Sequence, residues 1–294
     1  MNGPNGPQNS PRPSGERVGE RGGEAGNAIW CGIDVGSRSV KLVFVEDAAT
    51  GLVVKAMHIL FPGELDLAEG AELAYAEGLA TAGLCAAQIS GVVATGAGRR
   101  QAGFACDDVS EVSSAACGAV FLHPAARTVI DVGAEEGRAV RCDAAGHALD
   151  FAANEKCAAG AGAFAESMAR TLQLSLAEFG AAALRSTRLI PMNAQCTVFA
   201  ESEVVSLIHA ATPVADIARA VLDAVASRVG AMARRVGVDG GSEVVLIGGM
   251  VNNPGFVRAL RGSLGVDRLH LPELPEYVSA LGAALIAAER NAHD

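Results

Sequence analysis

Two short segments carry the residue types of a phosphate-binding turn. The tetrapeptide IDVG occurs at 33–36 and again at 130–133, and in both places it ends one apolar run and precedes another. In a tight strand–turn–strand, backbone N–H groups can donate to a phosphate while the acid orients Mg²⁺ or an attacking water. The candidate residues are Asp34, Gly36, Ser37 and the nearby Lys41 in the first copy, and Asp131, Gly133 and Ala134 in the second.

A third glycine-rich turn comes late in the chain. The segment IGGM at 247–250 follows an apolar run and precedes a helical pattern, so Gly248 and Gly249 would let an adenosine ring approach the backbone closely. No G-x-x-x-x-G-K-[ST] motif is present, and no G-x-G-x-x-G follows a strand. Ordinary hairpin glycines would explain any one turn alone. The duplicated IDVG together with the later Gly-Gly turn favours a nucleotide gripped from two sides.

Two cysteines stand at expected helix starts. Cys157 lies in EKCAAGAGAF (155–164) and Cys196 lies in AQCTVFAESEV (194–204). A helix N-terminus lowers the pKa of a thiol and supplies N–H donors to anionic sulfur. Two thiolates cannot complete a [4Fe–4S] cluster, which takes four, whereas two chains that contribute two each can. The pair is therefore either two incidental buried thiols or half of a cluster site in a homodimer or a heterodimer, with Cys106 as a reserve ligand.

The order of apolar runs and turns predicts an α/β fold built from two related halves. Before residue 28 the chain is rich in Gly, Pro, Asn, Arg and Glu, so residues 1–27 are expected to be a disordered tail. Strands are expected at 29–35, 40–45 and 52–60, and 89–98 is expected to be a buried strand that runs into a glycine loop. A strand–turn–strand–turn–strand is expected at 128–155 and a strand–turn–helix at 243–265. Helices are expected at 68–82, 111–124, 157–174, 176–184, 197–211, 214–236 and 279–291.

Composition narrows the function. The chain has 294 residues, a formal net charge of −10 and 50% hydrophobic residues. No basic block is present to contact nucleic acid, and no apolar run approaches the roughly 20 residues that cross a bilayer. The first 27 residues lack the apolar centre of a signal peptide. We therefore expect a cytoplasmic protein with reduced cysteines, and neither nucleic acid nor a membrane as a partner.

The order of two phosphate turns and a late adenosine turn resembles the actin/Hsp70/sugar-kinase ATPase superfamily. Within it, the segments GIDVGSRSVK, NEKCAAGAGAF, CTVFAESEV and SALGAALIA resemble the BadF/BadG/BcrA/BcrD ATPase family from Ala28 to Arg290. The resemblance implies two ribonuclease-H-like domains, at 28–127 and 128–278, with a C-terminal helix at 279–294 that returns to the first. It also implies that ATP and Mg²⁺ bind in the cleft.

Carried over by position, the resemblance makes Cys157 and Cys196 the ligands of a [4Fe–4S] cluster shared between two subunits. Dehydratase activators of the family usually have Asp-x-Gly-Gly-Gln-Asp at the second turn, whereas this chain has DVGAEE, with Ala134 and Glu135 in place of Gly and Gln. Glu135 could hold water or Mg²⁺ near the γ-phosphate. The assignments are Asp34, Gly36, Ser37 and Lys41 for the first phosphate turn, Asp131, Gly133 and Glu135 for the second, and Gly248 and Gly249 for adenosine.

The implied function is an ATP-hydrolysing iron–sulfur subunit that delivers low-potential electrons from a ferredoxin-type donor to a CoA-thioester enzyme. The form of the second turn favours a D-type subunit of benzoyl-CoA reductase, and the alternative is an activator of a 2-hydroxyacyl-CoA dehydratase. Two other possibilities stay open: a sugar kinase of the same superfamily without a cluster, and a non-catalytic subunit that keeps the ATPase fold.

Overall fold

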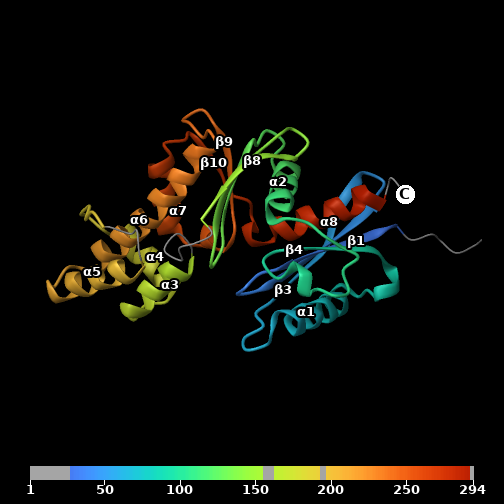
Figure 1. Ribbon diagram of the computed structural model, residues 1–294, viewed down its shortest axis with the longest axis horizontal. Coiled ribbons are helices and arrows are strands. Elements are labelled where there is room, and N and C mark those ends of the chain that lie inside the picture. The colour runs from blue at the N-terminus through green and yellow to red at the C-terminus, as the bar shows by residue number, and fades with distance from the viewer. Residues whose placement is uncertain (1–26, 155–161, 193–196, 292–294) are drawn as a thin grey trace, which may run out of the picture.

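The computed structural model describes residues 27–154, 162–192 and 197–291, and shows two lobes that each contain a five-stranded mixed sheet (Figure 1). The predicted tail at 1–27 falls almost wholly outside these ranges. The first sheet is formed by β1 (Ile29–Val35), β2 (Val40–Ala48), β3 (Gly51–Leu60), β4 (Ile89–Thr95) and β5 (Asp107–Asp108), with helix α1 (Leu67–Ala82) and short 3₁₀ turns at Ala86–Gln88 and Arg99–Gln101.

The second sheet and its helices follow α2 (Glu111–Leu122). The strands are β6 (Thr128–Val132), β7 (Gly137–Cys142), β8 (Ala148–Ala153), β9 (Glu243–Ile247) and β10 (Arg268–His270). The helices are α3 (Gly162–Thr171), α4 (Leu176–Leu184), α5 (Thr197–His209), α6 (Val214–Arg235), α7 (Pro254–Leu264) and α8 (Val278–Asn291), with 3₁₀ turns at Gly249–Asn252 and Pro275–Tyr277.

The two sheets have the same topology. The first has the order β3-β2-β1-β4-β5, and the second, taken from its β8 edge, has the order β8-β7-β6-β9-β10. In each sheet the strand that carries IDVG pairs antiparallel with the next strand of its hairpin and parallel with a strand that arrives later. The repeated tetrapeptide therefore marks a repeat of the whole sheet.

Sheet faces in the first lobe are covered by helices from opposite ends of the chain. Local sequence starts α1, because Asp66 accepts from the backbone N–H groups of Ala68 and Glu69 in a capping box. This helix packs on a face that includes Phe44. Helix α8 covers the other face, and it approaches so closely that a Cβ on Gly32 would lie 1.9 Å from the carbonyl oxygen of Ala280.

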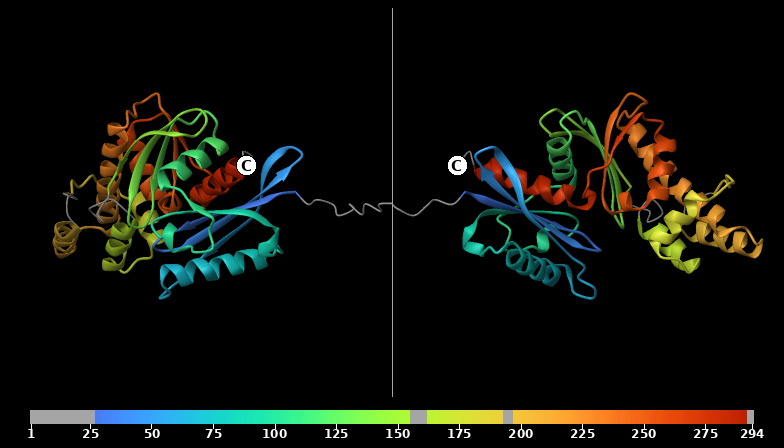
Figure 2. Two further views of the ribbon diagram at one scale, coloured as in Figure 1. Left: turned by 45° about the vertical axis from the view of Figure 1, so that its right-hand side comes forward. Right: turned by 180° about the vertical axis from the view of Figure 1, so that it is seen from behind.

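Helices α2 and α8 cross between the two lobes, as both views in Figure 2 show. The crossing depends on two glycines, because a Cβ on Gly118 would lie 2.1 Å from the oxygen of Val278, and one on Gly282 would lie 1.8 Å from the oxygen of Ser114. Helix α2 also covers one face of the second sheet, while α6 lies in the core on its other face. The pair of helices thus connects the lobes through backbone contact.

No helix in the described ranges is long and apolar enough to span a lipid bilayer.

Candidate active site

The two IDVG turns have the same backbone geometry. Gly36 donates its N–H to the oxygen of Ser39 at 3.2 Å, and Gly133 donates its N–H to the oxygen of Glu136 at 2.9 Å. Each turn closes the hairpin at the end of the central strand of its sheet, β1 or β6. Since the two sheets are topologically equivalent, the turns occupy equivalent positions in the two lobes.

In each hairpin the acid lies opposite a base on the neighbouring strand. Asp34 pairs in register with Lys41, whose Nζ lies 3.3 Å from the Asp34 carboxylate. Asp131 pairs in register with Arg138, whose Nη1 lies 3.1 Å from the Asp131 carboxylate. A Cβ on Gly36 would come within 3.3 Å of the Lys41 ammonium, so glycine leaves room for this contact.

Arg138 joins three carboxylates. Besides Asp131, it donates from Nη2 to Glu111 at 2.8 Å and also contacts Glu136. Burial raises the pKa of Asp131, and the nearby Asp34 carboxylate raises it further, while Arg138 opposes both effects. Burial likewise raises the pKa of Glu111 against the pull of Arg138. Asp34 of the first hairpin raises the pKa of both groups, so the two hairpins lie close enough for their carboxylates to interact.

A glycine with positive φ supports each acid from the neighbouring parallel strand. Gly96 follows β4 with φ +92°, and a Cβ there would lie 2.5 Å from Oδ1 of Asp34. Gly248 follows β9 with φ +89°, and a Cβ there would lie 2.6 Å from Oδ1 of Asp131. Only glycine meets both demands, the left-handed backbone and the missing side chain. Gly248 therefore lies against the second carboxylate, while Gly249 is exposed with open space around its Cα.

Both turns also contact the start of α3. The N–H groups of Gly162 and Ala163 donate to the oxygens of Gly133 and Ala134 at 2.9 and 2.7 Å. From the other lobe, Arg38 in the first turn forms an ion pair with Glu166 on α3. This helix begins directly after residues 155–161.

Several assigned residues meet in this site, and others do not. Six of them lie at the two turns: Asp34, Gly36, Lys41, Asp131, Gly133 and Gly248. Two more, Ser37 and Glu135, are exposed on the same turns. The roles assigned to all eight remain predictions. Cys157 and Cys196 lie outside the described residues. Within those residues, no group of three or more His, Cys, Asp or Glu side chains is arranged to hold a metal ion.

Four residues of the site were missing from the sequence assignments: Arg138, Glu111, Glu136 and Gly96. Arg138 and Glu111 carry no motif of their own, because their role depends on strand register and on the packing of α2. Gly96 had a visible signal, since the sequence ATGAG ends a buried strand as IGGM does.

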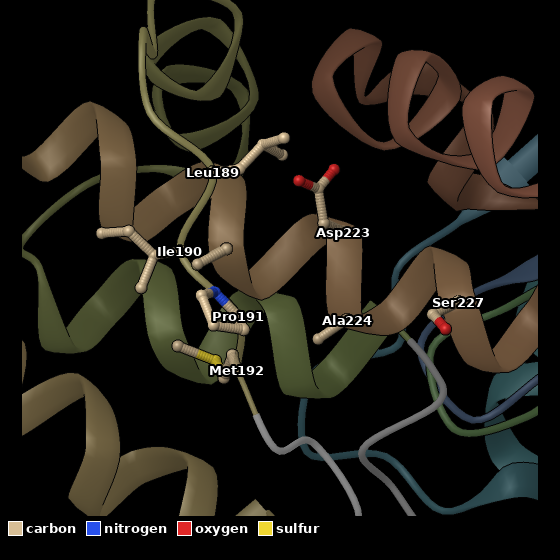
Figure 3. Close-up of a pocket in the computed structure, with 8 residues that line it drawn as sticks. Leu189, Ile190, Pro191, Met192, Asp223, Ala224 and Ser227 are labelled. Carbon is tan, nitrogen blue, oxygen red and sulfur yellow. The ribbon is translucent and has the colours of Figure 1, made fainter.

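A separate hollow lies on the second lobe away from these turns. The segment 189–192 runs beside α6, and the hollow is lined by Leu189, Ile190, Pro191 and Met192 of this segment and by Asp223, Ala224 and Ser227 of α6 (Figure 3). Its lining is mainly apolar and shares no residue with the carboxylate turns. We therefore place the candidate phosphate site at the turns.

The fold and the paired turns define an ATPase of the actin/Hsp70/sugar-kinase superfamily, which confirms the expected fold class. The model of the BadF/BadG/BcrA/BcrD ATPase family matches residues 31–287, and the chain belongs to that family.

Similarity to individual members is stronger for activators than for a reductase component. An activator of lactoyl-CoA dehydratase from Anaerotignum propionicum is 40% identical over 258 residues, which cover 88% of this chain and 96% of that protein. A solved structure of the activator of 2-hydroxyisocaproyl-CoA dehydratase from Clostridium difficile with bound ADPNP has a TM-score of 0.82 at 32% identity, and covers 90% of this chain and 96% of its own. The D-type subunit of benzoyl-CoA reductase from Thauera aromatica is 31% identical over 270 residues, covering 90% of this chain and 94% of that protein.

These comparisons bear on the predicted function. The form of the second turn favours a D-type reductase subunit, but the identities favour the alternative, an activator of a 2-hydroxyacyl-CoA dehydratase. That preference comes from one short segment, the DVGA…GRAVR form of residues 131–141, whereas the similarity extends over nearly the whole folded chain. Membership of this ATPase family is confirmed.

Proposed function

We propose that this protein is an ATP-hydrolysing activator that transfers an electron to a 2-hydroxyacyl-CoA dehydratase. The observation that carries the proposal is the pair of neighbouring Asp-Gly turns, in a chain that resembles a lactoyl-CoA dehydratase activator along nearly its full length. The turns account for the nucleotide, and the similarity accounts for the class of partner. Two copies of this chain, or this chain with a related subunit, would form the working unit.

The residues at the turns fit Mg²⁺ and a nucleoside triphosphate. Asp34, Asp131, Glu111 and Glu136 are balanced by only Lys41 and Arg138, so carboxylates are in excess. Mg²⁺ in nucleotide enzymes is usually held by one or two carboxylates with waters and phosphate oxygens, and therefore does not need a cage of three protein ligands. Asp34 and Asp131 would hold the ion, and the amides of both turns would donate to the β- and γ-phosphates.

The reaction at this site would be attack of a water on the γ-phosphorus of ATP, with ADP as the leaving group. Asp131 would orient that water, since its carboxylate is fixed by Arg138 and Gly248 leaves space beside it. Lys41 would neutralise charge on the transferring phosphoryl group. Glu135 is exposed on the turn and would take part only by reaching the γ-phosphate when nucleotide is bound.

The electron carrier rests on Cys157 and Cys196, which would hold half of a [4Fe–4S] cluster shared with the second subunit. When bound, the cluster would supply one electron to the partner enzyme, and a ferredoxin-type donor would restore it. Cys157 precedes the start of α3 in the sequence, and the first two residues of that helix, Gly162 and Ala163, donate hydrogen bonds to Gly133 and Ala134 of the second turn. Movement of that turn on nucleotide binding or hydrolysis would therefore reach the segment that contains this cysteine.

The ligand assignment is tested by iron analysis of protein purified without oxygen. We expect Cys157→Ala to lose iron and visible absorption while it still binds nucleotide. Cys85→Ala is the matched control, because Cys85 is exposed in the first lobe and should leave iron unchanged. Full iron content in Cys157→Ala would remove the cysteine from the ligand set.

The partner is tested by mixing the reduced protein and MgATP with the catalytic component of a 2-hydroxyacyl-CoA dehydratase, or with the catalytic subunits of a benzoyl-CoA reductase. We expect activation of the dehydratase. Activation of the reductase alone would support the D-type interpretation, which the DVGA…GRAVR form of residues 131–141 favours. ATP-dependent phosphorylation of a sugar by protein that contains no iron would support the kinase instead.

A further inference from the structure

Arg138 has the most connected side chain at the second turn. It is 8% exposed and contacts carboxylates from three places: Asp131 on its own hairpin, Glu136 in the turn, and Glu111 at the start of α2. A guanidinium can serve several acceptors at once because its donors point in fixed, separate directions. Here Nη1 points to Asp131 while Nη2 points to Glu111 and Glu136.

The equivalent residue of the first hairpin is different. Lys41 stands at the same register position as Arg138, but its described ion pair is with Asp34 of its own hairpin. The base opposite the acid therefore reaches an element outside the hairpin in the second copy, whereas in the first it stays within the hairpin, whose outside ion pair is made by the exposed Arg38. A lysine at 138 could keep the pair with Asp131 without reproducing the fork that also reaches Glu111.

The element that Glu111 belongs to is itself held in place. Helix α2 meets α8 at Gly282, where a Cβ would lie only 1.8 Å from the oxygen of Ser114, so the two backbones are in contact. The hydroxyl of Ser114 lies 2.9 Å from that of Thr95 at the end of β4 in the first lobe. Helix α2 thus contacts the first lobe on one side. On the other side it is linked through Glu111 and Arg138 to the Asp131 carboxylate of the second turn.

We infer that Arg138 is a positioning residue that fixes the Asp131 carboxylate relative to α2. The orientation of this carboxylate therefore depends on the orientation of the two lobes relative to one another. The inference rests on the proposed ATP hydrolysis. Five charged groups face Asp131 or its partner: Arg138 and Glu136 from the second hairpin, Asp34 and Lys41 from the first, and Glu111 from α2. Among them, Arg138 is the group that bonds directly to both Asp131 and α2.

The test compares Arg138→Met and Arg138→Lys in the full-length protein. We expect Arg138→Met to lower kcat for ATP hydrolysis about tenfold or more, because a small misplacement of a catalytic group lowers the rate steeply, while KM for MgATP changes less than about threefold. Arg138→Lys should recover part of kcat, since it keeps a cation beside Asp131. Arg141→Met on the same strand is the control, because Arg141 is exposed and lies outside the site.

A second variant separates the two interactions of Arg138, with Asp131 and with Glu111. Glu111→Gln keeps the pair between Arg138 and Asp131 but weakens the tie to α2, so we expect a smaller, several-fold loss of kcat. For each variant the dissociation constants of ADP and of a non-hydrolysable ATP analogue are also measured. We expect the affinity for both to stay near that of the unmodified protein, and thermal melting to show a folded protein.

The outcomes are distinct. Unchanged kcat in Arg138→Met would overturn the inference while leaving ATP hydrolysis intact, and so would a loss that appears only as weaker nucleotide binding. If Arg138→Met does not fold, Arg138→Lys decides: full wild-type kcat together with unchanged kcat in Glu111→Gln overturns the inference. If the unmodified protein hydrolyses no ATP, the proposed function fails and the inference falls with it.

Discussion

The two IDVG turns share a main-chain hydrogen bond and differ in the partners of their charged side chains. Both are closed by the same glycine-to-carbonyl hydrogen bond, and both place an acid opposite a base. In the first hairpin the base opposite the acid, Lys41, pairs only with Asp34 among the described ion pairs, whereas in the second Arg138 also reaches Glu111 on α2. The two hairpins thus share their main-chain hydrogen bond, and in the second the base also connects the acid to a helix between the lobes.

The largest expected effect comes from the two acids themselves. Asp131→Asn should lower kcat for ATP hydrolysis by roughly 10² or more, because the attacking water would no longer be oriented by a carboxylate. Asp34→Asn should act more through weaker binding of MgATP. Steady-state hydrolysis over a range of MgATP concentrations measures both, and a loss of less than tenfold in Asp131→Asn would contradict the role given to it.

The next effect tests the equivalence of the supporting glycines. Gly96→Ala and Gly248→Ala each place a Cβ within 2.6 Å of a carboxylate oxygen at a positive φ. Overpacking of this kind costs about 1–3 kcal/mol in the free energy of unfolding. Chemical denaturation measures it, with Gly249→Ala as the control, because no atom lies within 4 Å of a Cβ there. A loss at one site without the other would break the symmetry between the turns.

A smaller effect concerns the pH dependence of stability that arises from Glu111, the half-buried acid at the start of α2. Because burial raises the pKa of Glu111 in the folded protein, its charged form is less favourable there than in the unfolded chain. Its cost is absent below the unfolded pKa and fully present above the folded pKa, so stability falls as pH rises between them. Glu111→Gln removes this dependence. The difference in melting temperature between the variant and the unmodified protein should therefore grow in favour of the variant from acidic to neutral pH, and a constant difference would argue against it.

The smallest effect belongs to the ion pair between Arg38 and Glu166. Their side chains are 55% and 33% exposed, so the pair should contribute about 1 kcal/mol or less. Arg38→Glu and Glu166→Arg should each reduce stability slightly, and the double exchange should restore it. A double-mutant cycle at low and at high salt measures the coupling, which should shrink at high salt. Coupling that is insensitive to salt would mean that the pair is shielded from solvent.

Local sequence patterns were enough for the turns and for most elements. IDVG at both hairpins predicted the repeat, because a Gly after a strand-ending acid is a short-range signal. The boundaries of α4 and the start of α5 also follow from their sequence, and α4 begins with a capping box between Ser175 and Glu178.

Contacts between elements could not be predicted from local sequence patterns. The roles of Arg138 and Glu111 depend on which strand lies beside β6 and on where α2 begins in space, and neither is written in a local motif. Gly96 could have been found by treating ATGAG and IGGM as equivalent turns, which requires knowing that β4 and β9 hold equivalent places in their sheets. The cluster ligands Cys157 and Cys196 stay a prediction from sequence.

The packing of α8 has a consequence for synthesis of the chain. One face of the first sheet, with Trp30, Val43 and Val45, is covered by a helix made of residues 278–291. During translation this face forms early and remains apolar and uncovered until the last helix has left the ribosome. Premature termination before residue 278 would therefore release a first lobe with an open hydrophobic side, a species prone to aggregate and to be captured by chaperones.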